Sequence, residues 1–334
     1  GGTLVGIAGL AIDLGTTAQD LNNQNGLISS KGLLSIAHLR DLNNQNGVIN
    51  SKGVLSIATL RDLNNQQGEI SSVNSFSLTG NRFDNRGGNL ISKDQLTVTA
   101  ADLNNQNGLL SGWKGVSLSG GSVDNSLEGA ISSQLGNVNI DLSGALLNHS
   151  KGGIGGLGEV TITAASLDNS DKGIVTSKGE QQLILGSGGL NNARGGLIES
   201  SASLDIAAGD LDNQGGRLSA AGALSFTGNS LNNQGGNLRS EGAVTLDLLG
   251  ALVNAQGQLA ARGPLLLKRS SRIDNQGGQL ISQNLMTLFS ASLDNSNRGT
   301  LAANGALQVT TTGQLSNQGD GLIYSRDAGL SLNA

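Results

Sequence analysis

The sequence predicts an all-β protein, a parallel β-helix of about fifteen coils with about 21 residues and three short strands in each coil. Three observations predict this fold: a repeat of 21 residues, apolar residues spaced by two, and Asn and Gly between the apolar stretches. The repeat is clearest in residues 21–41 and 42–62, which are identical at 17 of 21 positions. Repeats of about 20–50 residues stack as solenoids, because each unit buries its apolar face against the next one.

Each unit opens on a large aliphatic residue or Phe, called the anchor here, with Asn two residues later. Leu21 and Leu315 are the first and last anchors, and individual spacings run from 20 to 23 residues. The repeat covers nearly the whole chain, so we expect one continuous solenoid over residues 1–334 rather than two domains. The fifteen anchors are Leu21, Leu42, Leu63, Phe83, Leu103, Val123, Leu146, Leu167, Leu190, Leu211, Leu231, Leu252, Ile273, Leu293 and Leu315.

The rest of the unit supplies two more strands. A Gly follows five or six residues after every anchor, an Ile, Leu or Val stands two residues after that Gly, and Ser, Ala or Gly stands four after it. Two apolar residues spaced by two, such as Leu34 and Ile36, usually close the unit, and this alternation is typical of a strand. We therefore expect an anchor strand, a post-glycine strand and a closing strand. The Gly is expected either to adopt a positive φ or to allow a close backbone approach.

The Asn two residues after the anchor is the most constant side chain of the unit. Asn tolerates left-handed backbone, and its amide both donates and accepts hydrogen bonds. Stacked Asn side chains can therefore bond along the solenoid, and an unpaired buried amide would cost about 1–3 kcal/mol. We predict a structural column, rather than a ligand site, at Asn23, Asn44, Asn65, Asn85, Asn105, Asn125, Asn148, Asn169, Asn192, Asn213, Asn233, Asn254, Asn275, Asn295 and Asn317.

Six units carry one extra residue between the anchor and the Gly, and four of these units are consecutive. Insertions in a solenoid form loops on one side, often the binding side, although drift among turns is the alternative. The long units are those anchored at Val123, Leu146, Leu167, Leu190, Leu293 and Leu315. We therefore divide the solenoid into a degraded partial coil at 1–20, regular coils at 21–122, less regular coils with longer turns at 123–200, and regular coils, truncated at the C-terminus, at 201–334.

Composition excludes several functions. The net charge is −5, the sequence pI is about 5.0, and no cluster of Lys and Arg marks a nucleic-acid surface. No apolar run reaches the roughly 18 residues that a membrane span needs. Cysteine is absent, which removes disulfides and thiolate metal sites.

Few residues are candidates for chemistry. His38 and His149 lie in unrelated coils, which argues against a transition-metal site. No pair of carboxylates stands apart from the repeat, so glycosidase chemistry has no candidate site. Trp113 and Tyr324 are isolated and are expected to be single surface residues. We predict no enzyme activity and no catalytic, cofactor-binding or metal-binding residues.

Stacked carboxylates also leave two alternatives. Asp20, Asp41 and Asp62 are spaced by 21 residues and should lie near one another. Carboxylates in that arrangement could hold Ca²⁺. Alternatively Arg40 and Arg61, which directly precede two of them, neutralise the carboxylates.

The units resemble a known family. The segments LNNQNGLISS, FDNRGGNLIS, LDNQGGRLSA, LNNQGGNLRS and IDNQGGQLIS are similar to the haemagglutinin repeats of filamentous-haemagglutinin-type exoproteins, and the resemblance covers residues 10–332. It implies a right-handed parallel β-helix that is exported by two-partner secretion across the Gram-negative outer membrane. The family includes filamentous adhesins, haemolysin-like exoproteins and the stalks of contact-dependent growth inhibition proteins, and it assigns no catalytic residues to these repeats.

The resemblance and the repeat together predict a structural stalk segment of a large, secreted, surface-exposed exoprotein. The expected partner of the full-length protein is an outer-membrane two-partner-secretion transporter, and the expected location is the surface of a Gram-negative bacterium. No cofactor is expected. The alternative function is an adhesin module, which binds a glycan or a receptor on a host or neighbouring cell through its own surface at 123–200.

Overall fold

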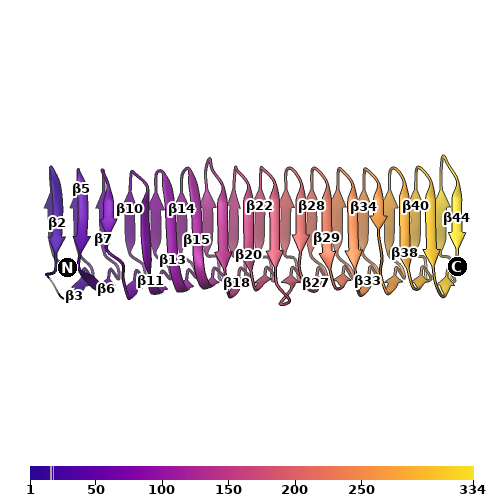
Figure 1. Ribbon diagram of the computed structural model, residues 1–334, viewed down its shortest axis with the longest axis horizontal. Helices are drawn as coiled ribbons and strands as arrows, with labels where there is room; N and C mark the ends of the chain where they lie inside the picture. The colour runs from indigo at the N-terminus through magenta and orange to yellow at the C-terminus, as the bar shows by residue number, and fades with distance from the viewer. Residues whose placement is uncertain (16, 18) are drawn as a thin grey trace. The chain divides into compact units, whose positions relative to one another are not determined.

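The computed structural model describes residues 1–15, 17 and 19–334, in two compact units, residues 1–165 and 166–334. Thr16 and Ala18, which fall in the predicted partial coil 1–20, lie outside the described residues. Throughout the described part of the chain the regular elements are β-strands, and strands of successive coils pair in parallel within each unit (Figure 1). This confirms the predicted fold class, an all-β parallel solenoid. No helix in the described residues has the length and apolarity to cross a membrane.

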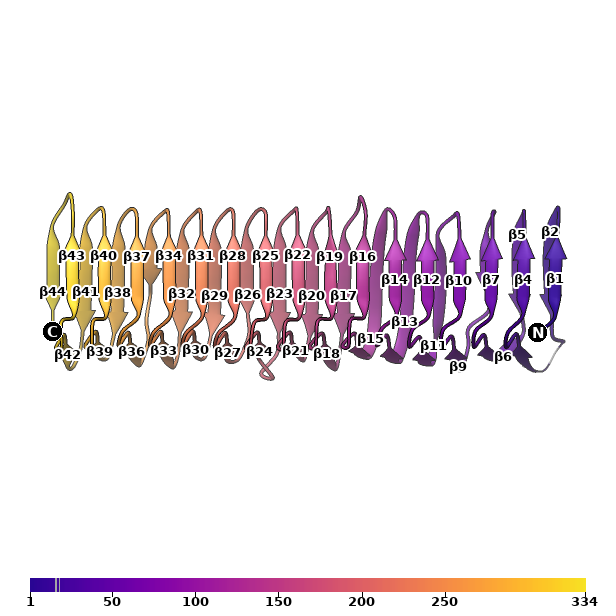
Figure 2. The ribbon, with the colours of Figure 1, turned by 180° about the vertical axis from the view of Figure 1, so that it is seen from behind.

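One coil follows the order that the repeat predicts. An anchor strand runs into the turn that holds Asn and Gly, a post-glycine strand follows, and a second turn leads to the closing strand. Post-glycine strands of successive coils lie side by side, as β4 (Leu27–Ser30) and β7 (Val48–Ser51) do (Figure 2). Their register places Ile28 opposite Ile49, so equivalent residues stack. A slip of one residue would turn every apolar side chain outward, so burial of one face fixes this register.

The strands of the first unit fall into the three expected rows. The post-glycine strands are β1 (Thr3–Gly6), β4, β7, β10 (Glu69–Ser72), β12 (Asn89–Ser92), β14 (Leu109–Gly112), β16 (Ala130–Ser133) and β19 (Gly153–Gly156). The closing strands are β2 (Gly9–Asp13), β5 (Leu33–Ala37), β8 (Leu55–Ile57), β17 (Val138–Leu142) and β20 (Val160–Ala164). The anchor strands are β3 (Gln19–Asn22), β6 (Leu39–Asn43), β9 (Asp62–Asn64) and β18 (Ala145–Leu147). Closing and anchor strands merge in β11 (Phe76–Asp84), β13 (Gln95–Asn104) and β15 (Gly115–Asp124).

The second unit repeats the same three rows. Its post-glycine strands are β22 (Ile174–Ser177), β25 (Leu197–Ser200), β28 (Arg217–Ala220), β31 (Asn237–Ser240), β34 (Gln258–Ala261), β37 (Gln279–Ser282), β40 (Thr300–Ala303) and β43 (Leu322–Ser325). Its closing strands are β23 (Gln181–Leu185), β26 (Leu204–Ala207), β29 (Leu224–Gly228), β32 (Val244–Leu248), β35 (Leu265–Leu267), β38 (Met286–Ser290), β41 (Leu307–Thr311) and β44 (Leu330–Asn333). Its anchor strands are β21 (Ser166–Asp168), β24 (Leu190–Asn191), β27 (Leu211–Asp212), β30 (Leu231–Asn232), β33 (Ala251–Val253), β36 (Arg272–Asp274), β39 (Leu293–Asp294) and β42 (Leu315–Ser316).

The N-terminal residues form a further coil before the coil that begins at the first anchor. In the described residues, β1 pairs in parallel with β4 and β2 pairs with β5, with Leu10 opposite Leu34. Leu10 is only partly buried, and Leu4 is 48% exposed. Residues 3–13 therefore follow the path of a coil, and Leu4, Gly6, Leu10 and Ile12 stand at its post-glycine and closing positions.

The core of each unit consists of aliphatic columns. Anchors such as Leu63 and post-glycine residues such as Ile70 are 2% and 0% exposed, and the closing pair Leu96 and Val98 is 0% and 1% exposed. Buried and exposed residues alternate along the strands, as a two-residue period requires. Aromatic residues are rare, and Phe83 occupies an anchor position.

Gln181 is the polar exception in the closing-strand column of the second unit. It opens β23, is 1% exposed, and stands where the following coils have Leu204, Leu224 and Val244. Its Nε2 has no hydrogen-bond partner within the described part of the chain, and its Oε1 lies 3.5 Å from the Ser177 Oγ. This amide is therefore an energetic weak point in an otherwise apolar column.

Replacing Gln181 by leucine is expected to stabilise the coil by about 2 kcal/mol, because an unpaired buried amide costs about 1–3 kcal/mol. Hydrogen exchange of peptides from this coil, followed by mass spectrometry, measures the change. Gln182 is the next residue and is exposed, so Gln182→Leu is the matched control and is expected to leave exchange unchanged. Equal protection in the wild-type and Gln181→Leu chains would show that the amide is satisfied in solution.

Candidate functional site: the asparagine ladder and its turns

The predicted Asn residues lie at the start of the turn that follows each anchor strand. All thirteen of these residues from Asn44 to Asn295 are fully buried, at 0% exposure. Asn23 is 6% exposed, and Asn317 is exposed. The backbone N–H of Asn44 donates to Asn64 O at 2.7 Å, so backbone pairing holds the residue in place.

Within each unit the amides form a chain of hydrogen bonds. In the first unit, the Nδ2 of each Asn donates to the Oδ1 of the next: Asn23 to Asn44, Asn44 to Asn65, Asn65 to Asn85, Asn85 to Asn105 and Asn105 to Asn125 at 2.7 Å, and Asn125 to Asn148 at 2.8 Å. In the second unit, the bonds run from Asn169 to Asn192 and Asn192 to Asn213 at 2.8 Å, and then through Asn233, Asn254, Asn275, Asn295 and Asn317 at 2.7 Å.

The direction of these bonds is set by the backbone around them. The Nδ2 of Asn44 also lies 3.1 Å from Gly47 O in its own turn and 3.1 Å from Glu69 O in the next coil. Carbonyl oxygens only accept, so the NH₂ group must face them and the Oδ1 must face the preceding Asn. Every amide of a unit therefore points the same way, and each coil binds the next through side chain and backbone together.

The Gly after the turn is required by this ladder. A Cβ on Gly47 would lie 2.3 Å from Asn23 O and 2.7 Å from Asn44 Oδ1. Of the two roles expected for this Gly, the structure shows the close approach. Positive φ belongs instead to the preceding residue, such as Asn25 at +55° and Asn46 at +52°.

The six long units differ at this same turn. Each has two consecutive residues with positive φ where the short units have one. The pairs are Leu127 and Glu128, Ser150 and Lys151, Asp171 and Lys172, Arg194 and Gly195, Asn297 and Arg298, and Gly319 and Asp320. The Asn and the close-packed Gly keep their contacts in these coils, as Asn125 does with Gly129 O at 3.1 Å. The extra residue thus lengthens the turn without interrupting the ladder.

The small residue four positions after the Gly packs the second turn of the coil. Ser240 Oγ lies 2.6 Å from Gly222 O of the preceding coil and accepts the N–H of Gly242 at 3.0 Å. Ser51 occupies the equivalent position, with its Oγ 2.8 Å from Gly32 O. A hydroxyl here satisfies backbone groups that a buried turn would leave unpaired.

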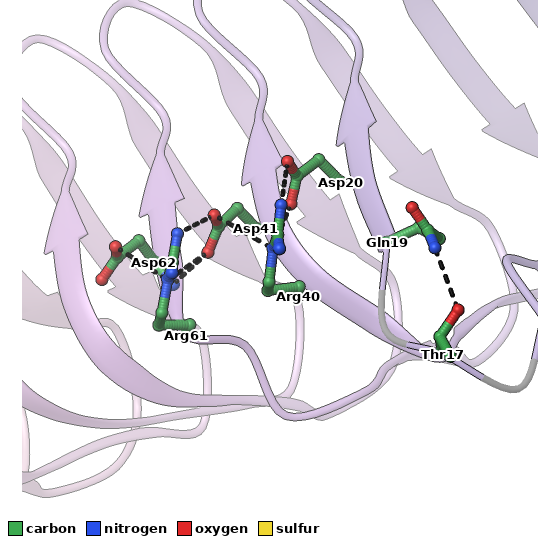
Figure 3. A network of polar contacts seen from close by, with 7 residues as sticks. All are labelled: Thr17, Gln19, Asp20, Arg40, Asp41, Arg61 and Asp62. Carbon is green, nitrogen blue, oxygen red and sulfur yellow. Dashed lines mark hydrogen bonds and ion pairs between the residues drawn. The ribbon is translucent and has the colours of Figure 1, made fainter.

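The stacked carboxylates form a network with the arginines (Figure 3). Arg40 donates to both oxygens of Asp20 at 2.8 and 2.6 Å, and Arg61 donates to both oxygens of Asp41. Arg61 also lies 3.4 Å from Asp62. The hydrogen bond from Arg40 lowers the pKa of the Asp20 carboxyl below its ordinary value. Guanidinium groups therefore stand between the carboxylates, as the neutralisation alternative predicts.

The other candidates for chemistry are not brought together. His38 Nδ1 lies 2.7 Å from Asp13, whereas His149 Nδ1 lies 2.9 Å from the hydroxyl of its neighbour in sequence. Trp113 and Tyr324 are 50% and 46% exposed and belong to different units. Among the described residues, no group of three or more His, Asp and Glu side chains is arranged to hold a metal ion.

Sequence reasoning missed the ion pairs that connect the long turns. Glu128 and Lys151 are 2.7 Å apart in the first unit, and Asp171 and Arg194 are 2.6 Å apart in the second. The hydrogen bond from Lys151 lowers the pKa of Glu128. These ion pairs could have been predicted from the sequence, because residues of opposite charge stand next to the inserted position in consecutive long units.

This arrangement stacks successive coils on one another, and the comparison with known families identifies the repeat that they form. A family model described as the haemagglutinin repeat matches the overlapping segments 7–61, 60–126, 92–150, 135–184, 176–263, 231–288 and 253–319. No curated protein and no solved structure gives a significant match. The matches extend over most of the sequence and over both structural units, and the coils described above are the repeats that they match. The chain therefore belongs to the haemagglutinin-repeat family.

Proposed function

We propose that this segment is a structural stalk of a large, secreted exoprotein on the surface of a Gram-negative bacterium. Haemagglutinin repeats imply an adhesin-like filamentous repeat region. The stalk carries a distal adhesive or toxin-delivery region away from the cell, after export by an outer-membrane two-partner-secretion transporter. In this proposal residues 1–334 act as one continuous β-helix, with regular coils at 21–122 and 201–334 and longer turns at 123–200.

The observation that supports a mechanical role is the buried amide ladder. Within each unit, a coil is held to its neighbours by parallel backbone pairing and by a side-chain bond of 2.7–2.8 Å in the interior. The free energy of unfolding of such a stack is approximately a sum of the stabilities of the coils and of the interfaces between neighbouring coils. Coils can therefore be added without changing the structure of the others. The function then depends on the number of coils, each contributing about 4.8 Å along the stack.

A second candidate function is direct binding through the longer turns at 123–200. The paired residues with positive φ, such as Leu127 and Glu128, favour it, because they extend the turn on one side. Leu127 is 46% exposed there. Insertions on one side of a solenoid often belong to a binding face.

A coil exchange in the full-length exoprotein separates the two functions. Residues 123–210 hold four coils, and a second copy of residues 21–102 supplies four coils with different turns. A stalk retains adhesion or delivery after this exchange, whereas deletion of the four coils shortens its reach by about 19 Å. An electron-microscopic label beyond the segment measures the reach. Loss of activity after the exchange, with reach preserved, would refute the stalk and favour the binding module.

A further inference from the structure

The second turn of each coil, between the post-glycine and closing strands, forms a distinctive edge in the first unit. We call it the lysine–apolar edge. It consists of the turns at 31–33, 52–54, 73–75, 93–94, 113–114, 134–137 and 157–159. Large apolar side chains on this edge are exposed to solvent: Leu33 50%, Val54 50%, Val73 42%, Trp113 50%, Leu135 61% and Leu157 55%.

Backbone hydrogen bonds stack these turns directly on one another. The N–H of Val73 donates to Ser51 O at 3.1 Å, that of Trp113 to Ser92 O at 2.9 Å, and that of Leu135 to Trp113 O at 2.8 Å. Successive turns are therefore separated by the strand spacing of about 4.8 Å, and the seven turns cover about 29 Å. Residues that are far apart in the sequence become one stripe on the loops along the top of the first unit in Figure 1.

Lysines are interleaved with the apolar residues of this edge. Lys31, Lys52 and Lys93 form no ion pair among the described residues, and Lys114 lies 3.2 Å from Asp94. The edge carries four lysines against two carboxylates, whereas the rest of the first unit carries five basic and ten acidic residues. The positive charge is thus concentrated on the same edge as the exposed apolar side chains.

A hollow between two of the lysines gives the edge a place for an anionic group. Val73 stands in the turn where the coils on either side have Lys52 and Lys93, and these three residues line a hollow of about 290 Å³. Ser71 and Glu69 also line the hollow, and the Glu69 carboxylate accepts a hydrogen bond from the Ser71 hydroxyl at 2.7 Å. Lys52 and Lys93 both line this hollow, and neither lysine forms an ion pair among the described residues.

The equivalent edge of the second unit has neither the row of exposed apolar side chains nor the excess of positive charge. Its turns expose one large apolar side chain, Leu285, at 37%. Its charges are balanced, because Lys178, Arg262 and Arg326 are matched by three carboxylates at positions 180, 241 and 327. Arg262 and Arg326 are also paired, at 2.9 and 2.7 Å, with carboxylates of the same edge. The lysine–apolar edge is therefore not a consequence of the fold, since the same turns elsewhere are polar and balanced.

We propose that the lysine–apolar edge docks on the surface of an anionic phospholipid membrane. Surfaces that lie in the membrane interface combine Lys with Trp and Leu, whose apolar parts enter the headgroup region. Each Lys near an anionic leaflet strengthens binding about fivefold. Lys52 and Lys93 hold headgroup phosphates at the hollow, while Leu33, Trp113 and Leu135 enter the interface. The stripe is a row of projecting turns, which fits a broad surface better than it encloses a soluble ligand.

The single tryptophan of the chain makes the proposal directly testable, because Trp113 lies on the proposed edge. The 334-residue chain is mixed with phosphatidylcholine vesicles, with or without phosphatidylglycerol. Membrane docking shifts the Trp113 emission to shorter wavelength and carries the chain into the vesicle pellet, only when phosphatidylglycerol is present. Combined Lys31→Gln, Lys52→Gln and Lys93→Gln substitutions weaken partitioning about a hundredfold.

The second unit supplies the matched control. Combined Lys178→Gln, Arg262→Gln and Arg326→Gln substitutions remove the same charge from the equivalent edge and leave partitioning unchanged. Far-UV circular dichroism checks that both triple variants keep their fold. Equal losses in the two variants, or Trp113 emission that stays unchanged on bound vesicles, would overturn the proposal.

A third variant distinguishes membrane docking from the binding of a soluble polyanion or of a second copy of the chain. Leu135→Ser weakens vesicle binding severalfold if apolar side chains enter the interface. If Leu135→Ser has no effect while soluble heparin competes fully, the lysines bind a polyanion and membrane docking is wrong. A Trp113 emission shift that depends on protein concentration without vesicles would assign the edge to a second copy of the chain and would also overturn docking.

Discussion

Replacing Asn233 by alanine is expected to destabilise the second unit by about 4 kcal/mol. Asn233 is fully buried, accepts from Asn213 at 2.7 Å and donates to Asn254 at 2.7 Å. The substitution removes both bonds and a contact of 3.1 Å to Gln258 O. Each buried polar group left without a partner costs about 1–3 kcal/mol, and at least two are affected. Hydrogen exchange should therefore rise in the coils on both sides of residue 233.

Two further substitutions make this prediction specific to the hydrogen bonds. Asn233→Asp keeps the size of the side chain but loses the NH₂ donor, so it is expected to destabilise at least as much as alanine at neutral pH. Asn232→Ala is the control, because Asn232 is the preceding residue and is only partly buried. Asn232 donates to Asp212 Oδ1 and accepts the N–H of Gln234, and both bonds lie near the surface, so its loss is expected to cost only about 1 kcal/mol. Similar effects at positions 232 and 233 would contradict a role for the ladder in stability.

Replacing Gly236 by alanine is expected to destabilise the same coil by about 3 kcal/mol, the upper part of the usual range for overpacking. The new Cβ would lie 2.2 Å from Asn213 O and 2.7 Å from Asn233 Oδ1. Asn213 O accepts the N–H of Gly216 at 2.9 Å, so it cannot move without breaking a turn. Urea unfolding followed by circular dichroism, with hydrogen exchange to locate the loss, measures the effect.

The adjacent glycine is the control for this substitution. Gly235 has φ of +61° and nothing within 4 Å of its would-be Cβ, so Gly235→Ala adds only the strain of a left-handed conformation, about 1 kcal/mol. Gly235→Asn is expected to be nearly neutral, because Asn adopts this conformation at the equivalent positions Asn25 and Asn46. A larger loss at Gly235 than at Gly236 would contradict the close approach as the reason for the Gly.

Several features of the turns could be located in the sequence but not explained by it. The Gly after the anchor was visible at every repeat, yet its role depended on the distance to Asn Oδ1 in the same coil and to a carbonyl in the preceding coil, as at Gly47. The extra residue in the long units was visible too. That it produces a second residue with positive φ, such as Glu128 after Leu127, depended on the backbone path around the preserved ladder.

For the outward side chains, the sequence does not show which residues lie together, whereas the structure does. Ser77, Thr97 and Ser117 are far apart in the chain, and strand register places them opposite one another on β11, β13 and β15. The lysine–apolar edge arises in the same way, since Trp113 and Leu135 belong to different repeats. Outward positions are not restrained by packing, so most of their residues vary from coil to coil, and the repeat pattern does not indicate the surface that these variable residues form.

The sequence by itself determined the fold class, the period and the positions of the amide ladder, because burial imposes the same residue types on every coil. The buried anchors, the Asn column and the Gly all recur at a fixed phase for that reason. The tertiary structure alone decided the direction of the ladder, the reason for the Gly and the composition of each edge. All three properties depend on which atoms of neighbouring coils come within about 3 Å of each other. Such contacts join residues roughly one repeat apart. The sequence gives the types of these residues but not the distances between their atoms.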